Sequence, residues 1–252
     1  MIKIRFKNTV LLWLTLIFIG INNLYAQNLE VQTIQKQEES QVSKSIDPIW
    51  FPAANHLEDW SHHLEGKRIA LVGNQTTVVV NDDGGYIHLA DHLLEKGYDL
   101  KKVFAPEHGF RGTADAGEVV KDGIDVQTGL PIISLYGKNK KPTAEQLKDI
   151  DLIIFDIQDV GVRFYTYIST LHYVMQAAAE NDIKVLVLDR PNPNGHYVDG
   201  PVLDMQHTSF VGMHPIPVVH GLTIAEYASM VNRESWLGKD LFCDLHVIMM
   251  KG

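Results

Sequence analysis

The segment Ala105-Pro-Glu-His-Gly-Phe-Arg-Gly112 places an acid, an imidazole and a guanidinium in one short turn directly after an apolar run. Glu107 and His108 are residue types that transfer protons in hydrolytic enzymes. Arg111 offers a planar fork of donors that matches a carboxylate or a phosphate. Polar residues and glycines also serve ordinary turn geometry. The segment by itself therefore leaves an active site and a structural turn open.

Further turns along the chain carry residues of the same kinds after apolar runs. They are Asn74 and Gln75, then Asp156, Gln158, Asp159 and Arg163, then Asp189, Arg190 and Asn192, and finally His220 before the last helical segment. In an open α/β sheet, ligands bind outside the carboxyl ends of the strands. Any one of these turns is typical of a cap or a surface ion pair, but together they favour one functional cleft.

The densest of these turns follows an apolar run that ends near residue 157. Asp156 and Gln158 alternate with apolar residues, so on a strand they would share one face. Arg163 has two interpretations. It either binds an anionic ligand or is the buried partner of Asp156 or Asp159.

Aromatic and rigid segments accompany these polar residues. Tyr165 and Tyr167 have rings that can stack on sugars and hydroxyls that can hydrogen-bond. Two prolines stiffen residues 189–195, which suits either a polar wall of a site or a stiff connector. His220 directly precedes a helix that begins with the Thr223 cap, and the positive helix end favours a neutral imidazole.

Short apolar runs alternate with helix-period segments from residue 67 onward, which indicates a parallel sheet covered by helices. The expected strands are Arg68–Val72, Leu100–Phe104, Ile132–Leu135, Leu152–Ile157 and Val185–Leu188, with a strand-like run from Leu245. The expected helices are Ile87–Lys96, a segment from the Thr143 capping box, Tyr167–Asn181 and Thr223–Asn232. No Gly-x-Gly-x-x-Gly follows the first strand, so no dinucleotide cofactor is expected.

The first residues have the pattern of a signal peptide. Lys3, Arg5 and Lys7 precede the apolar run Val10–Ile21, which is short for a bilayer span, and cleavage after Ala26 is plausible. An uncleaved anchor is the alternative. We expect export to the periplasm or the cell exterior, with no stable membrane insertion after cleavage.

The mature chain is expected to consist of a polar linker and lead-in over residues 27–63 and a domain over residues 64–252. Removing the signal peptide takes the formal charge from -9 to -12, which argues against nucleic acid as a partner. Cys243 is the single cysteine, so no internal disulfide is expected.

A metal site is not expected. His88 and His92 have the helical spacing of metal ligands, but no clustered cysteine or histidine completes a set. A solvated helix face explains them, and His62 and His63 are treated in the same way.

Several motifs together resemble the NamZ/YbbC-like exo-β-N-acetylmuramidases. They are Gly66–Thr76, Ala105–Gly112, Ser134–Gly137, Asp156–Tyr167, Asp189–Pro193 and His220–Glu226, in unbroken order. The resemblance implies a glycoside hydrolase that removes N-acetylmuramic acid from the non-reducing end of peptide-free peptidoglycan fragments. It also implies a Rossmann-like domain followed by a smaller C-terminal domain, which we expect to be missing from this sequence.

The resemblance and the residues together give a set of expected roles. Glu107 is the candidate general acid/base, and Asp156 or Asp159 is the second group, with His108, Tyr165 and His220 in support. The lactyl carboxylate of the sugar would pair with Arg163 or Arg190. The remaining expected substrate-binding residues are Asn74, Gln75, Arg111, Gln158, Tyr167, Asp189 and Asn192.

Two other functions are compatible with these residues. The acids and histidines, Glu107, His108, Asp156, Asp159 and His220, could gather divalent metals for amide or phosphoester hydrolysis, which chelation would inhibit. The domain could also bind cell-wall sugars without cleaving them. The sequence does not decide between retention and inversion of the anomeric configuration, because that depends on the separation of the carboxyl groups.

Overall fold

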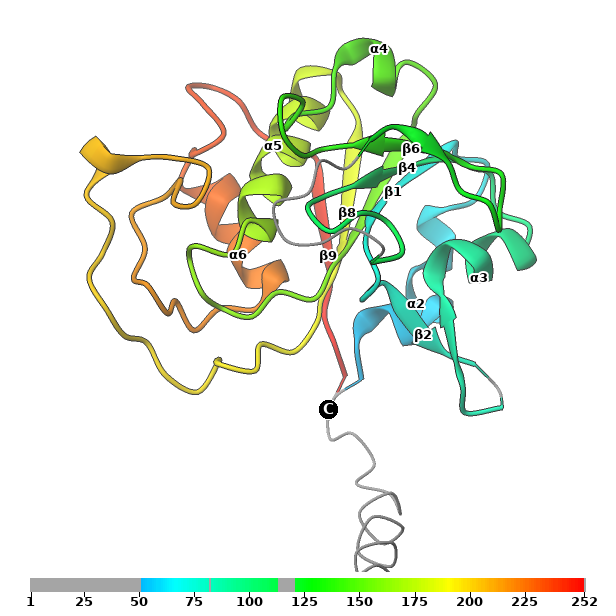
Figure 1. The fold of residues 1–252 in the computed structure, drawn as a ribbon, viewed down its shortest axis with the longest axis horizontal. Helices are drawn as coiled ribbons and strands as arrows, with labels where there is room; N and C mark the ends of the chain where they lie inside the picture. The colour runs from blue at the N-terminus through cyan, green and yellow to red at the C-terminus, as the bar shows by residue number, and fades with distance from the viewer. Residues whose placement is uncertain (1–50, 82, 113–120, 252) are drawn as a thin grey trace, which may run out of the picture. The chain divides into compact units, whose positions relative to one another are not determined.

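The fold is an α/β domain built on a seven-stranded sheet (Figure 1). The computed structural model describes residues 51–81, 83–112 and 121–251, and all of them lie in one compact unit. The strand order is β5-β6-β4-β1-β7-β8-β9. Neighbouring strands are parallel, apart from the antiparallel pair of β5 and β6 at one edge. The strands are β1 Ile69–Gly73, β4 Leu100–Ala105, β5 Gly123–Ile124, β6 Pro131–Ser134, β7 Leu152–Asp156, β8 Lys184–Leu188 and β9 Leu245–Ile248.

The parallel strands have the Rossmann order. Numbered along the chain, they lie as 3-2-1-4-5-6, so the winding direction reverses between β1 and β7. These two strands pair in register from Ile69 with Leu152 to Gly73 with Asp156. A reversal of this kind leaves a crevice at the carboxyl ends of the two strands, where doubly wound folds bind their ligands. The predicted parallel α/β fold is therefore confirmed, with its binding edge at Gly73 and Asp156.

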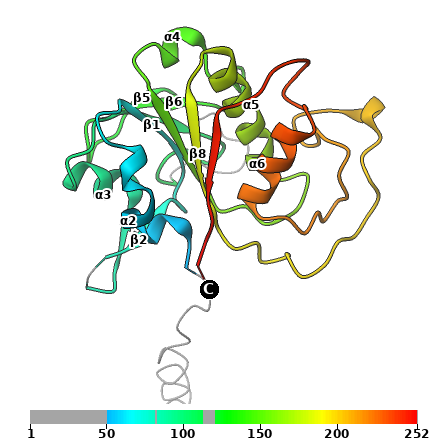
Figure 2. The same cartoon turned by 180° about the vertical axis from the view of Figure 1, so that it is seen from behind.

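Helices cover both faces of the sheet, as the two opposite views in Figures 1 and 2 show. On one face the core includes α5 Tyr167–Glu180 and α6 Ile224–Arg233, packed on strand residues such as Ala70 and Phe155. On the other face the core includes α2 Leu57–Trp60 and α3 Leu89–Glu95, packed on Leu71 and Ile154. Successive strand residues alternate between the two cores, as side chains of a strand must.

Residues 51–63 are packed into the domain. They form two 3-10 turns, Ala53–Asn55 and Ser61–His63, on either side of α2. Trp60 is fully buried and donates its indole N–H to the carbonyl of Ala53 at 3.1 Å. The packed domain therefore begins before residue 64, where the sequence analysis set its start. The expected signal peptide and most of the expected linker fall outside the described residues.

The predicted helices are present, with shifted ends. Capping boxes begin α4 Ala144–Leu147 and α6, as expected from Thr143 and Thr223. The helix expected from residue 87 begins at Leu89, because residues 86–88 form a strand of the hairpin β2 Val78–Val80 and β3 Tyr86–His88. The sequence analysis did not foresee that hairpin. In the part of the chain that the structure describes, no helix is long and apolar enough to cross a bilayer.

A long excursion, residues 189–223, connects β8 to α6. Within it the only helical turn is the 3-10 turn Met205–His207. The excursion lies beside α5 and α6 (Figure 1). Its two ends return to the binding edge of the sheet, because His220 N donates to Gly161 O at 3.1 Å and Ala53 N donates to Asp189 O at 2.9 Å.

Candidate active site

Glu107 lies on the turn that leaves β4, and its carboxylate is half-buried. The turn is tight, since Gly109 N donates to Pro106 O at 3.1 Å and His108 adopts a positive φ of 70°. Thr166 Oγ1 donates to Glu107 Oε2 at 3.1 Å. The hydroxyl of Tyr136 also donates to Glu107, and this hydrogen bond raises the pKa of Tyr136. Hydroxyls from the β6 exit and the start of α5 therefore fix one reachable carboxylate.

Tyr167 links Glu107 to a second, buried carboxylate. Burial raises the pKa of the half-buried Tyr167 hydroxyl, the side-chain amide of Asn74 lowers it, and the charges of Glu107 and Asp159 raise it further. Asn74 Nδ2 is buried and makes no hydrogen bond of normal geometry within the described residues. The Tyr167 hydroxyl is thus influenced by the charges of both acids and lies next to the Asn74 amide.

Asp159 is the second carboxylate, and it is almost completely buried. Burial raises its pKa to about 6, against the lowering effect of the Gly161 and Val160 backbone N–H groups. Its Oδ2 accepts from Gly161 N at 2.7 Å, whereas Oδ1 has no partner among the described residues. Gly161 is required at this point, because its φ is +71° and a Cβ there would lie 2.3 Å from Asn192.

His220 faces Asp159 from the end of the excursion. Its Nε2 lies 3.8 Å from Asp159 Oδ2, and both side chains are buried. Its Nδ1 accepts from Leu222 N at 3.3 Å. Burial lowers the pKa of His220 to about 4, so the imidazole is neutral at pH 7. A neutral ring with an accepting Nδ1 carries its hydrogen on Nε2, which is buried near the acid but makes no hydrogen bond within the described residues.

Asp156, the other candidate for the second catalytic carboxylate, forms an ion pair with an arginine. Arg190 donates Nε–H to Asp156 Oδ1 at 2.6 Å and Nη2–H to Oδ2 at 2.8 Å. Asp156 is fully buried, and Arg190 is 5% exposed and also binds Val78 O at 3.2 Å. This geometry indicates a structural ion pair at the switch point. Of the two expected candidates, it leaves Asp159 as the better second carboxylate, and Arg190 is not available to a ligand.

Arg111 and Arg163, the other two arginines expected at the site, also hydrogen-bond to groups of the protein itself. Arg111 binds both Asp91 and Asp125, each with contacts of 2.8 Å, and lowers the pKa of Asp125 to about 2. Arg163 donates to the carbonyls of Pro201 at 2.9 Å and Ile216 at 2.5 Å. The expected pairing of Arg163 with Asp156 or Asp159 is therefore not found. Arg111 supports its loop, while Arg163 remains half-buried beside the excursion.

Most of the expected polar residues build the strand exits by hydrogen bonds to the backbone. Gln158 Nε2 donates to Asp159 O at 2.7 Å and to Pro191 O at 2.6 Å. Asn192 Nδ2 donates to Leu222 O at 2.9 Å. These bonds tie the β7 and β8 exits together and to the excursion.

Asn74 and Asp189 have comparable structural bonds. Asn74 Oδ1 accepts from Thr76 N at 2.8 Å, and Asp189 Oδ1 accepts from Ala225 N at 3.1 Å in the first turn of α6. Gln75 and Tyr165 differ from them, because both are exposed beside the site.

Sequence reasoning missed Tyr136 and Thr166. Tyr136 stands in the Ser134–Gly137 motif at a strand exit, so the strand-exit argument applied to the third strand would have found it. Thr166 lies between Tyr165 and Tyr167, two of the expected site residues, and directly precedes the first residue of α5. Its contact with Glu107 spans 59 positions and has no local sequence signal.

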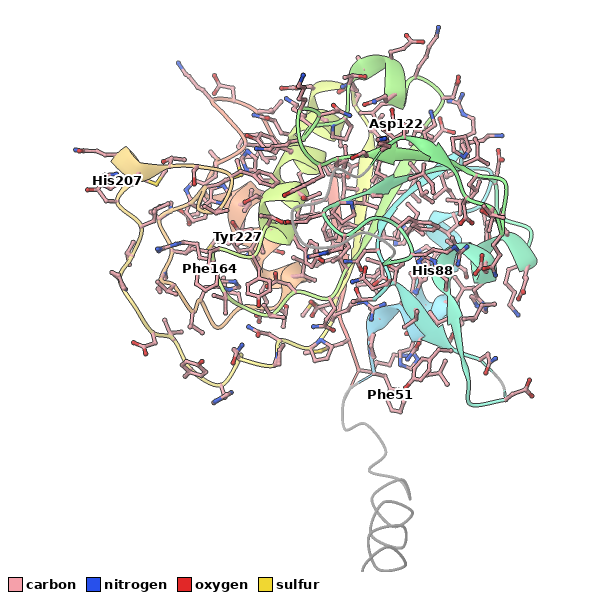
Figure 3. The ribbon with its side chains drawn as sticks, viewed as in Figure 1. Phe51, His88, Asp122, Phe164, His207 and Tyr227 are labelled. Carbon is pink, nitrogen blue, oxygen red and sulfur yellow. The ribbon has the colours of Figure 1, made fainter. Side chains whose placement is uncertain are left out.

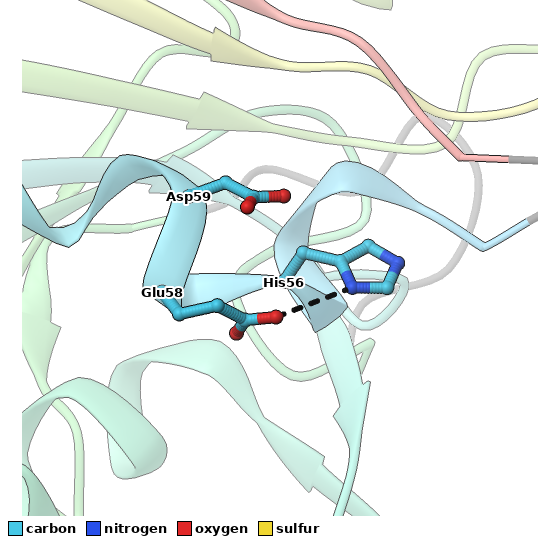
Figure 4. Close-up of side chains that lie close together, drawn as sticks. All are labelled: His56, Glu58 and Asp59. Carbon is cyan, nitrogen blue, oxygen red and sulfur yellow. Dashed lines mark ion pairs between the residues drawn. The ribbon is translucent and has the colours of Figure 1, made fainter.

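The residues considered as possible metal ligands are not arranged as a metal site in the described part of the chain. His88 accepts from Ala90 N through Nδ1 at 3.2 Å and places Nε2 3.0 Å from Asn74 O, so both ring nitrogens are used. Within the described ranges, the only close group of possible ligands is His56, Glu58 and Asp59 (Figure 4). Glu58 and Asp59 are exposed there, and Glu107, Asp159 and His220 form no such group.

Comparison with known proteins gives a consistent family. Residues 69–252 match the family model described as exo-beta-N-acetylmuramidase NamZ, N-terminal. The chain is 48% identical over 198 residues to the peptidoglycan beta-N-acetylmuramidase NamZ of Bacillus subtilis (strain 168), covering 77% of this chain and 46% of that protein.

Two crystal structures of DUF1343 family proteins from Bacteroides fragilis NCTC 9343 are similar as well. Both give a TM-score of 0.71, with 47% and 42% sequence identity. Each comparison covers 81% of this chain, and 52% and 50% of the two solved chains. The chain therefore spans about half the length of these relatives. On these matches, the chain belongs to the family of the N-terminal domain of the exo-β-N-acetylmuramidase NamZ.

Proposed function

We propose that this chain carries the catalytic carboxylates of an exported glycoside hydrolase of the cell wall. Its substrate is the non-reducing N-acetylmuramic acid of peptide-free peptidoglycan fragments. The B. subtilis relative named peptidoglycan beta-N-acetylmuramidase supports this assignment. The observation that carries it is Glu107, a half-buried residue whose carboxylate is held by Thr166 and Tyr136 at the strand exits that also carry the buried Asp159.

In this mechanism Glu107 donates a proton to the glycosidic oxygen as the bond to the anomeric carbon breaks, so the remaining saccharide leaves as an alcohol. A water molecule then adds to the anomeric carbon, and its proton passes to a carboxylate. Asp159 is the second carboxylate, and the charges of both Asp159 and Glu107 act on the Tyr167 hydroxyl. Since Asp159 is buried, its role is to stabilise charge and hold a proton, and direct attack on the sugar is not assigned to it.

Exposed residues beside Glu107 supply the binding surface. Tyr165 is 47% exposed and Phe164 is 54% exposed, with ring centroids 5.8 Å apart. Figure 3 labels Phe164 on the segment that leads into α5. Aromatic faces of this kind bind the apolar faces of sugars. Arg163 is the candidate for the lactyl carboxylate, because its carbonyl partners leave its positive charge uncompensated by a carboxylate within the described contacts.

The test uses the full-length protein and a pair of chromogenic substrates, a β-N-acetylmuraminide and the matching β-N-acetylglucosaminide. The expected result is release from the muraminide and little from the glucosaminide, with free N-acetylmuramic acid as the product from peptide-free fragments by mass spectrometry. Turnover should be unchanged after EDTA treatment. Loss of activity on chelation would favour the metal-dependent alternative, and sugar binding without any product would favour the non-catalytic one.

A further inference from the structure

A buried chain of polar rings lies behind the candidate site. His214 Nδ1 lies 2.5 Å from Tyr227 Oη, and His214 Nε2 lies 3.0 Å from His172 Nδ1. The three residues are 3%, 1% and 5% exposed, in the order His214, Tyr227, His172. They come from the excursion, from α6 and from α5, and Figure 3 labels Tyr227 on α6. The chain thus joins three segments that are distant in the sequence.

The hydrogen-bond pattern fixes where each hydrogen lies. Burial lowers the pKa of His214 to about 3 and that of His172 to about 4, so both rings are neutral at pH 7. A neutral imidazole donates with one nitrogen and accepts with the other. If His214 donated from Nδ1, the Tyr227 hydroxyl would need another acceptor, and none lies in reach among the described residues.

An unsatisfied buried donor destabilises the folded state. The favoured arrangement therefore has the Tyr227 hydroxyl donating to His214 Nδ1 and His214 Nε2–H donating to His172 Nδ1. His172 and His214 then both carry their hydrogen on Nε2.

The same chain reaches the second carboxylate through Tyr227. The Tyr227 ring contacts the His220 ring with centroids 5.7 Å apart; burial raises the pKa of Tyr227, and the charge of Asp159 raises it further. His220 in turn presents Nε2 to Asp159. On its far side, His214 stacks on Trp236 at 4.6 Å and 15°. The Tyr227 ring is therefore held at its hydroxyl by His214 and lies next to the His220 ring at a tilt of 42°.

We propose that Tyr227, held by His214 and His172, is a positioning residue that fixes the ring of His220 beside Asp159. This inference rests on the proposed function, because it gives Asp159 a defined place behind Glu107. The charged groups that face the network are Asp159, on the loop after β7, and Lys141, whose charge acts on His172. Packing alone would be served by apolar rings, whereas this chain specifies one proton arrangement.

Histidine NMR on the full chain tests the arrangement without any need for activity. At pH 7 the nitrogen shifts of His172, His214 and His220 should all report hydrogen on Nε2. Tyr227→Phe removes one hydroxyl and keeps the ring, so His214 should become a tautomer mixture and the His220 Nε2 hydrogen should exchange faster with water. Tyr173→Phe is the matched control, since the Tyr173 ring contacts His172 at 5.5 Å but its hydroxyl is outside the chain of hydrogen bonds.

Kinetics of the full-length protein provides the second readout. Tyr227→Phe should lower kcat about 10-fold with KM within about twofold, because a small misplacement of a catalytic group costs turnover more than binding. At His214, asparagine places its amide near Nδ1 and can keep the Tyr227 bond, whereas glutamine places it near Nε2. His214→Asn should therefore retain most of kcat, and His214→Gln should behave like Tyr227→Phe.

The outcomes separate this inference from the proposed function. If Tyr227→Phe leaves the His220 signals, kcat and the pH profile of kcat unchanged and only lowers the melting temperature, the network is merely structural and the inference is wrong. If the wild-type protein does not cleave muraminides, the proposed function fails. In that case the NMR comparison still decides whether Tyr227 orders His220.

Discussion

The exit of β4 and the exits of β7 and β8 both place a carboxylate at the binding edge, but they use it in opposite ways. Glu107 is half-buried and is held by the hydroxyls of Thr166 and Tyr136. Asp156 is fully buried and is held by both arms of Arg190 at 2.6 and 2.8 Å. The hydroxyls donate hydrogen bonds without adding a charge, whereas the guanidinium places a full positive charge against its carboxylate.

The difference shows that one strand exit uses its carboxylate to stabilise the fold, whereas the other holds the carboxylate proposed for catalysis. Asp156 and Arg190 cross-link the switch point, so the crevice where β1 and β7 diverge is rigid. Glu107 stands at the neighbouring exit and is only half-buried. Asp159 is intermediate, since it is buried like Asp156 but, among the described residues, the only basic side chain within 4.0 Å is His220, which is neutral at pH 7.

The largest expected effect on stability follows from breaking the ion pair of Asp156 and Arg190. Arg190→Met keeps much of the side-chain volume but leaves the buried Asp156 carboxylate without its cation. This should lower the free energy of unfolding by about 3–5 kcal/mol. Urea unfolding measures this loss. Lys101→Met is the control, because it breaks the exposed pair with Asp99 at 2.7 Å and should cost less than about 1 kcal/mol. Equal losses in the two variants would contradict a structural role for Arg190.

Asp159→Asn should stabilise the fold at pH 8 by up to about 3 kcal/mol. The pKa of Asp159 is about 6 in the native state against a reference value of 3.8, so the native state binds this proton more tightly than the unfolded state. Ionising Asp159 therefore opposes folding above pH 6, and this penalty disappears as the pH falls to about 4. The gain of the variant should shrink over the same window when urea unfolding is repeated at several pH values. A variant less stable than the wild type at pH 8 would show that Asp159 has a compensating partner.

A smaller effect is expected at the hydroxyls around Glu107. Tyr136→Phe removes one hydrogen bond to Glu107 and should lower kcat about 10-fold while changing the free energy of unfolding by about 1 kcal/mol. Steady-state hydrolysis by the full-length protein measures the first quantity. Tyr86→Phe is the matched control, since Tyr86 is 76% exposed on β3 and is outside the motifs of the site. An unchanged kcat in Tyr136→Phe would show that Thr166 alone positions the carboxylate.

The sequence predicted the sheet and its binding edge well, because both follow from local patterns. Apolar runs and the capping boxes at Thr143 and Thr223 placed the strands and helices to within a few residues. The strand-exit rule also brought Glu107, Asp156 and Asp159 to the same edge.

Pairings between distant residues were not predictable in this way. Nothing local distinguishes Arg190, which takes Asp156, from Arg163, which takes two carbonyls. The partners of Glu107 and the rings of His172 and His214 likewise come together only through tertiary packing. The excursion also lacks periodicity, so the position of its residues against α5 and α6 has no sequence signal.

The most direct test of the assignment of chemistry to Glu107 is turnover of a chromogenic β-N-acetylmuraminide by full-length Glu107→Gln, with unfolding followed on the same sample. Glutamine keeps the shape and can still accept from Thr166, so the free energy of unfolding should stay within about 1 kcal/mol of the wild type. Turnover should fall by at least about 1,000-fold, since the variant has no proton to donate. A folded Glu107→Gln protein that keeps wild-type turnover would contradict the account.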